Sequence, residues 1–151
     1  MLTLEKTLIL SLYELRLLIR GRAALLILAA FPILGGAVFG LASKGQGTSA
    51  SHGVFLILPI SALLMAVGLK TSGLFPPGED RLAGPVVNGA SRALVMLVVL
   101  AAQGALYTGM LSLLAPSSVP GMGMLLLALA VSLILGVAAE MLMPAHRVRA
   151  D

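Results

Sequence analysis

Four long apolar stretches dominate this sequence and restrict what it can fold into. Each contains about 20 residues, and a helix of that length, rising about 1.5 Å per residue, crosses a hydrocarbon core about 30 Å thick. A backbone in lipid must satisfy its own N–H and C=O groups, so each stretch is expected to be helical. We therefore predict an all-α membrane protein with four transmembrane helices, over Ala23–Ala42, Val54–Leu74, Ala93–Leu114 and Gly121–Met143.

The basic residues lie almost entirely on one side of these predicted spans. Of the 10 Lys and Arg residues, only Lys44 falls in the connection between the first and second spans. The positive-inside rule makes the side that carries the others cytoplasmic. We therefore expect both termini and the 75–92 loop to be cytoplasmic, which agrees with an even number of spans. The cytoplasmic set comprises Lys6, Arg16, Arg20, Arg22, Lys70, Arg81, Arg92, Arg147 and Arg149.

Composition argues against several classes of protein. With 151 residues, 59% hydrophobic and 11% charged, the chain has loops too short for a separate soluble core, which predicts a single helical membrane domain over 1–151. The topological bias accounts for the net charge of +4, so no nucleic-acid partner is expected. Cysteine is absent, and His52 and His146 fall on opposite sides of the predicted membrane, so we expect no metal site and no cofactor. No phosphate-binding loop or catalytic constellation is evident, and the chain is not expected to be an enzyme.

Residues 2–20 predict an N-terminal amphipathic interfacial helix rather than a fifth span. Polar residues recur at helical spacing and form a stripe, at Thr3, Thr7, Ser11 and Glu14. Apolar residues recur in the same rhythm on another face, at Leu4, Leu8, Leu12, Leu15 and Ile19. Three arginines near the end of the helix can meet anionic headgroups. We expect the helix to lie in the interface plane with its apolar side toward the bilayer, and the chain to bend at Gly21.

The first span carries residues that affect packing and shape. Pro32 lies near its middle and is expected to kink the helix, because proline removes one intrahelical hydrogen bond. Gly36 and Gly40 form a GxxxG pair, which allows another backbone to approach closely. Generic close packing explains all three residues, and a gating role for the kink is the alternative.

Polar residues at depth are the usual pointers to function in a membrane protein. Gln103 lies in the middle of the third predicted span and Ser132 in the middle of the fourth. We expect them to face one another across the hairpin in a hydrogen bond, with the lining of a substrate path as the alternative. Glu140 is interpreted as an interfacial residue that reaches headgroups or pairs with His146 or Arg147.

The segment Gly78–Arg92 reads as a motif on the cytoplasmic side. Glu79 and Asp80 favour the positive end of a helix, so a short amphipathic helix lying along the membrane is expected there, with Asn88 and Gly89 as a turn before the third span. Such a helix can dock into a groove of a soluble partner.

At this point the chain resembles the membrane subunit of ABC-2-type transporters, which include bacterial drug- and antibiotic-export permeases. The resemblance rests on the amphipathic helix 2–20, on Phe31–Pro32 in the first span, and on Asp80–Gly84 with Arg92 eight residues further on. It implies a permease in the bacterial plasma (inner) membrane whose cytoplasmic loop contacts a separate ATPase subunit. The residues that it assigns to this coupling are Glu79, Asp80, Arg81, Gly84 and Arg92.

Other interpretations remain open at this stage. Family members usually have six spans per subunit and this chain has four, so a split permease half or an accessory subunit of similar ancestry also fits. A homodimer mate or other membrane chains would then complete the assembly. A non-transporting structural subunit of a larger membrane complex is the main alternative, ahead of a membrane-embedded enzyme or a channel. The sequence does not specify a transported substrate.

Overall fold

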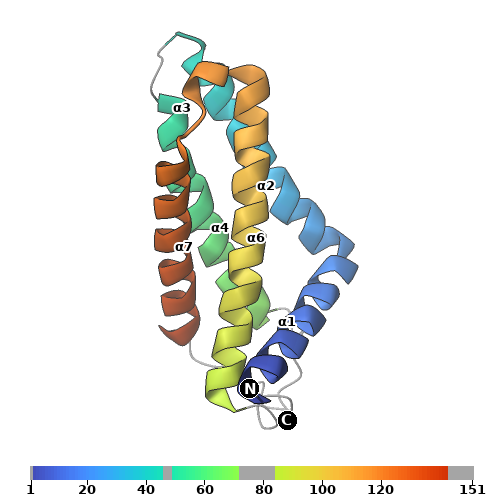
Figure 1. Ribbon diagram of the computed structural model, residues 1–151. Coiled ribbons are helices and arrows are strands. Elements are labelled where there is room, and N and C mark those ends of the chain that lie inside the picture. Colours follow the sequence, from blue (N-terminus) through green and yellow to red (C-terminus); the bar gives the residue numbers. More distant parts are fainter. Residues whose placement is uncertain (1, 46–48, 72–83, 143–151) are drawn as a thin grey trace.

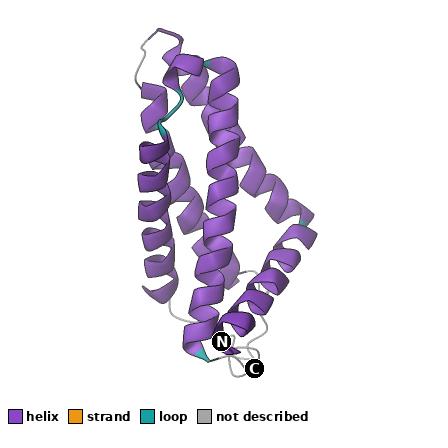
Figure 2. Ribbon diagram, viewed as in Figure 1, coloured by secondary structure: helices purple, strands orange, loops and turns teal. Residues whose placement is uncertain are grey.

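The computed structural model describes residues 2–45, 49–71 and 84–142, and the regular elements in these ranges are helical (Figure 1, Figure 2). These ranges contain no strand, so the prediction of an all-α protein is confirmed for them. The elements are α1 (Leu2–Arg20), α2 (Arg22–Ala42), η1 (Ser43–Gly45), α3 (Ser49–His52), α4 (Val54–Thr71), α6 (Pro85–Leu114), η2 (Pro116–Ser118) and α7 (Met122–Leu142).

Three of these helices are long and apolar enough to cross a membrane. The qualifying stretches are Leu25–Ala42 in α2, Val86–Leu114 in α6 and Met122–Leu142 in α7. α4 adds a shorter apolar stretch, Val54–Val67. Large apolar side chains remain exposed along all four helices, such as Leu26, Leu64 and Ile134. This is the expected distribution for a multi-pass membrane protein, because lipid solvates apolar side chains.

Packing divides the molecule into a bundle and an angled N-terminal helix. α2, α4, α6 and α7 run lengthwise, whereas α1 meets α2 at an angle and returns to the end at which α6 begins (Figure 1). α4 packs chiefly against α7, and α2 packs against α6. The core includes fully buried Leu58 of α4 with Met96 and Leu100 of α6.

Small residues allow α4 and α7 to lie close together. Ala62 and Ala66 of α4 are fully buried, as is Ala128 of α7. A Cβ added to Gly136 of α7 would collide with the Met96 side chain and lie 3.3 Å from the Ala62 Cβ. Helices in lipid associate through such close van der Waals packing, because lipid tails are as apolar as the side chains.

Gly21 separates α1 from α2, at the position where the sequence predicts a bend. Its N–H donates to the carbonyls of Leu17 and Leu18, both at 3.2 Å, and so closes the last turn of α1. Its ψ of 83° leaves the helical range, and α2 begins at the next residue with Gly21 as its N-cap. The change of direction between the two helices therefore occurs at one residue.

α1 is helical as predicted, and the structure adds that its polar stripe is the face that meets the protein. Ser11 and Glu14 of the polar stripe are buried, whereas Leu4 and Leu12 of the apolar face are exposed. α1 lies along α6, and it directs the end of its polar stripe at that helix. The end of the stripe is buried because α6 offers a hydrogen-bond donor to Glu14, and the placement of the apolar face toward the bilayer stays a prediction.

The predicted start of the third span is wrong, because the sequence places it at Ala93 whereas α6 begins at Pro85. Residues 85–92 are the first two turns of α6 rather than a separate helix followed by a turn, and Asn88 and Gly89 are helical. Gly84 is the N-cap, with a positive φ of 77° that glycine adopts readily, and Pro85 is the first helical residue. α1 packs against this stretch and supports the weak helix formers in it.

Candidate functional site

A buried hydrogen bond joins α1 to the start of α6. The Ser91 hydroxyl donates to Oε2 of Glu14 at 2.8 Å. Glu14 is 4% exposed and Ser91 is fully buried. A buried carboxyl group is costly unless it is hydrogen-bonded, and the Ser91 hydroxyl supplies a partner. This contact therefore fixes the register of α1 against α6.

The next residue of α6 joins that helix to α7. Arg92 Nη1 donates to Oε1 of Glu140 at 2.7 Å, and the two side chains are 21% and 11% exposed. The sequence interprets Glu140 as a headgroup contact or a partner of His146 or Arg147. In the structure Glu140 binds Arg92, and the pairing with His146 or Arg147 stays a prediction because residues 143–151 lie outside the described ranges. An acid near the end of one span and a base near the start of another meet because the two helices are antiparallel neighbours.

Together these two contacts gather three helices at one level of α6. Ser91 and Arg92 are adjacent, and their side chains reach α1 and α7 respectively. We call the four residues Glu14, Ser91, Arg92 and Glu140 the polar clamp.

A second feature lies at Pro32 in the middle of α2. Proline has no N–H, so the carbonyl of Leu28, four residues earlier, lacks its usual helical donor. The Gln103 side chain of α6 fills this role, and its Nε2 donates to the Leu28 oxygen at 2.9 Å. Gln103 is 2% exposed, and Pro32 is fully buried. The side-chain amide therefore satisfies the carbonyl that the proline leaves free.

The expected bond between Gln103 and Ser132 is not formed. The Ser132 hydroxyl donates to the Ala128 carbonyl of its own helix, whereas Gln103 is directed to α2. The prediction placed the two residues together because they have similar depths, but depth does not determine which way a side chain points around its helix. The position of Pro32 carries the missing signal, since it identifies the carbonyl that needs a donor.

The GxxxG pair packs within the chain. A Cβ added to Gly36 would lie 2.9 Å from the Met110 Cβ and 3.2 Å from the Tyr107 carbonyl oxygen. At Gly40 the nearest atom would be the Leu114 Cβ, at 3.1 Å. Both glycines are buried, so they allow α2 to approach the second half of α6. With Gln103, they form a contact between α2 and α6 that runs from Leu28 to Gly40.

Three residues that the resemblance assigns to partner coupling, Glu79, Asp80 and Arg81, lie outside the described residues. Of the other two, Gly84 caps α6 and Arg92 belongs to the polar clamp. Sequence reasoning missed Glu14 and Ser91 as partners, because the polar stripe of an amphipathic helix does not indicate which residue of another helix meets it. Within the described ranges no three His, Cys, Asp or Glu side chains come close enough to hold a metal ion.

Comparisons of this chain with protein-family models, with curated proteins and with solved structures found no match.

Proposed function

We propose that the chain crosses a bacterial plasma (inner) membrane four times, with both termini on the cytoplasmic side. The bias of basic residues supports this orientation. α4 has 18 residues, and at 1.5 Å per residue its length is about 27 Å, close to the hydrocarbon thickness of about 30 Å. It also packs along α7, which has the length of a full span. We therefore count α4 as the fourth span.

Reporter fusions test this topology. A periplasmic reporter inserted at Gly47 or Ser118 is expected to be active, and a cytoplasmic reporter after Asp151 is expected to be active as well. The physical reason is that translocating the basic loops costs more than translocating the nearly uncharged ones. A periplasmic C-terminus would contradict both the orientation and the count of four.

We further propose that this chain is a permease-like membrane subunit of an ATP-driven, ABC-type transporter. ATP hydrolysis is assigned to a separate cytoplasmic chain that contacts the 78–92 segment. The observation that carries this proposal is the polar clamp, because it connects α1 and α7 to the first turns of α6, which form the second half of that segment. A partner that pushes on the segment would move three helices together rather than one.

The contact between α2 and α6 supplies a second element of this mechanism. Pro32 interrupts the hydrogen-bond ladder of α2, and helices bend where the ladder is interrupted. Because Gln103 holds the freed carbonyl from α6, a shift of α6 along its axis acts on α2 at its weakest point. We propose that the bend of α2 changes with the position of α6.

The second candidate is a non-catalytic structural or accessory subunit of a larger membrane complex. The observation that favours it is that the polar side chains in the middle of the spans bind backbone carbonyls within the bundle. Gln103 serves a backbone carbonyl of α2 and Ser132 serves its own helix, so both act as packing groups. Under this proposal the chain binds other membrane proteins, or a second copy, without an ATPase contact.

Co-purification from mild detergent separates the two candidates. A transport subunit is expected to retain an ATPase chain, and reversal of the pair Asp80 and Arg81 is expected to release that chain while the protein still inserts in the membrane. The swap keeps net charge, so a headgroup contact tolerates it whereas a specific protein groove does not. Lys44→Glu, directly after the C-terminal end of α2 and away from the 78–92 segment, is the surface control. If the native chain retains membrane proteins but no ATPase, the accessory role is supported instead.

A further inference from the structure

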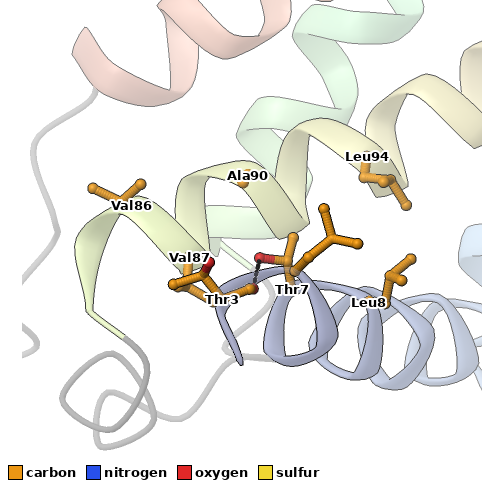
Figure 3. A pocket seen from close by; sticks show the side chains of 8 residues that line it. Thr3, Thr7, Leu8, Val86, Val87, Ala90 and Leu94 are labelled. Atoms are coloured by element: carbon orange, nitrogen blue, oxygen red, sulfur yellow. Dashed lines mark hydrogen bonds between the residues drawn. The ribbon is translucent and has the colours of Figure 1, made fainter. Parts of the chain in front are cut away.

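α1 turns its polar stripe toward α6 along most of its length. In the N-terminal half of α1, Thr3 and Thr7 line a groove against Val87 and Ala90 of α6 (Figure 3). In the C-terminal half, Glu14 is buried and accepts a hydrogen bond from α6. The side chains on the opposite face of α1 therefore point away from α6.

The outward face of the C-terminal half of α1 carries basic side chains. Tyr13, Arg16 and Arg20 follow one another at spacings of three and four residues, so they share one face of the helix. All three are exposed. Arg22, the first residue of α2, is exposed as well, just after the bend between the two helices (Figure 1). We call Arg16, Arg20 and Arg22 the arginine elbow.

α1 and α2 offer no exposed acid close to the arginine elbow. The two helices contain only the acids Glu5 and Glu14. Glu14 lies two residues before Arg16, but it is 4% exposed and is bound to Ser91. Glu5 is exposed, but it lies about 16 Å before Arg16 along the helix, which exceeds the Debye length of about 8 Å at physiological salt. The fold therefore leaves a local excess of positive charge at the elbow.

The arginine elbow lies directly before the apolar part of α2. The stretch Leu25–Ala42 has 18 residues, about 27 Å in length, which is close to the hydrocarbon thickness of about 30 Å. Arg22 precedes Leu25 by about 4.5 Å along the helix. The headgroup layer extends about 5–8 Å beyond the hydrocarbon on each side. The start of α2 therefore places the elbow at the level of the lipid headgroups.

From these observations we infer that the arginine elbow binds the phosphate of an anionic phospholipid in the cytoplasmic leaflet. Guanidinium groups donate paired hydrogen bonds that match phosphate oxygens, and the excess of positive charge selects a headgroup with net negative charge. The exposed side chains beside the elbow, Leu12, Ile19 and Leu26, are apolar and suit acyl chains, and the ring and hydroxyl of Tyr13 suit the membrane interface. An acidic soluble protein would not account for this apolar surround. The inference rests on the membrane setting and orientation proposed above, but not on a transport role.

Native mass spectrometry of the full chain tests this site. The protein is purified in mild detergent with equal amounts of phosphatidylglycerol and phosphatidylcholine, and the ratio of the two lipids in the first retained molecule is measured. Arg16→Gln, Arg20→Gln and Arg22→Gln are made singly. Lys6→Gln is the matched control, because Lys6 is an exposed cation of the same helix that lies about 15 Å before Arg16. The reporter after Asp151 is read in every variant, so that an inverted chain is recognised separately.

We expect the wild-type chain to prefer phosphatidylglycerol, and each arginine variant to lower that preference by about fivefold. Lys6→Gln is expected to change it by less than about twofold, because the elbow lies beyond the Debye length. A wild-type chain without a preference, or an equal loss in all four variants, would overturn the proposal, and the equal loss would indicate attraction by net charge alone. An acidic soluble protein that the arginine variants release, with the lipid preference unchanged, would overturn it in favour of a protein partner. Because the three arginines are exposed, their variants are expected to fold, and circular dichroism checks the helix content.

Discussion

Replacement of Gln103 by Leu tests whether the side-chain amide compensates for Pro32. In the native chain, Gln103 Nε2 donates to the Leu28 carbonyl at 2.9 Å, in the place of the N–H that proline lacks. Leucine has a similar size and no donor. The variant therefore keeps the packing between α2 and α6 and leaves the Leu28 carbonyl without this partner.

The expected cost comes from two opposing terms. A buried carbonyl without a donor costs about 1–3 kcal/mol. The substitution also removes the Gln103 Oε1, which is buried without a hydrogen-bond partner in the native structure, and this offsets part of the loss. Hydrogen bonds between helices in membrane proteins average about 0.6 kcal/mol and reach about 1.7. We therefore expect Gln103→Leu to lower the free energy of unfolding by about 0.5–1.5 kcal/mol.

The second substitution is Pro32→Ala, which restores the backbone donor. Alanine at position 32 can donate its N–H to the Leu28 carbonyl as in any helix. In that background Gln103→Leu removes a buried amide without leaving the carbonyl unpaired, so it should be neutral or slightly stabilising. The two substitutions are thus expected to be coupled by about 1 kcal/mol.

The assay is reversible unfolding in mixed micelles, with added SDS as denaturant and the far-UV circular dichroism of the helices as the signal. The four chains of a double-mutant cycle are compared. Ser132→Ala, made in the native and the Pro32→Ala backgrounds, is the control, because this buried hydroxyl bonds within its own helix. A coupling between positions 32 and 103 no larger than that of the control would refute the compensation.

Two further predictions concern contacts of α6. Gly36→Ala is expected to destabilise the protein by about 1–3 kcal/mol, because the added Cβ lies 2.9 Å from the Met110 Cβ. Gly109→Ala should be neutral or stabilising, because its added Cβ meets nothing within 4 Å. The same unfolding assay checks both variants, and equal effects would contradict the packing. Glu140→Gln is expected to cost about 1–3 kcal/mol by leaving a partly buried guanidinium without its carboxylate, and Arg92→Gln added to it should recover part of that loss. If the double variant loses as much free energy of unfolding as the two single variants together, or more, the pairing is contradicted.

The sequence predicted much of the secondary structure, because that structure depends on local properties. The length and hydropathy of the apolar runs require helices in lipid, and the break at Gly21 follows from the weak helix propensity of glycine next to a change in composition. The prediction failed at the start of α6, where Asn88 and Gly89 resemble a turn. Local propensity was overridden there because Pro85 favours the first helical position and α1 packs on the following turns.

The pairing of polar side chains was decided by the tertiary structure. Amphipathic spacing places Glu14 in a stripe, but only the approach of α6 turns that stripe inward to Ser91. The depth of Gln103 in its span can be read from the sequence, but its partner depends on which neighbouring helix lies in the direction of the side chain. The sequence by itself therefore determined that helices form and approximately where the long apolar ones lie along the chain. The rotation and neighbours of each helix arise from packing between residues far apart in the chain, and these select the hydrogen bonds that hold the bundle together.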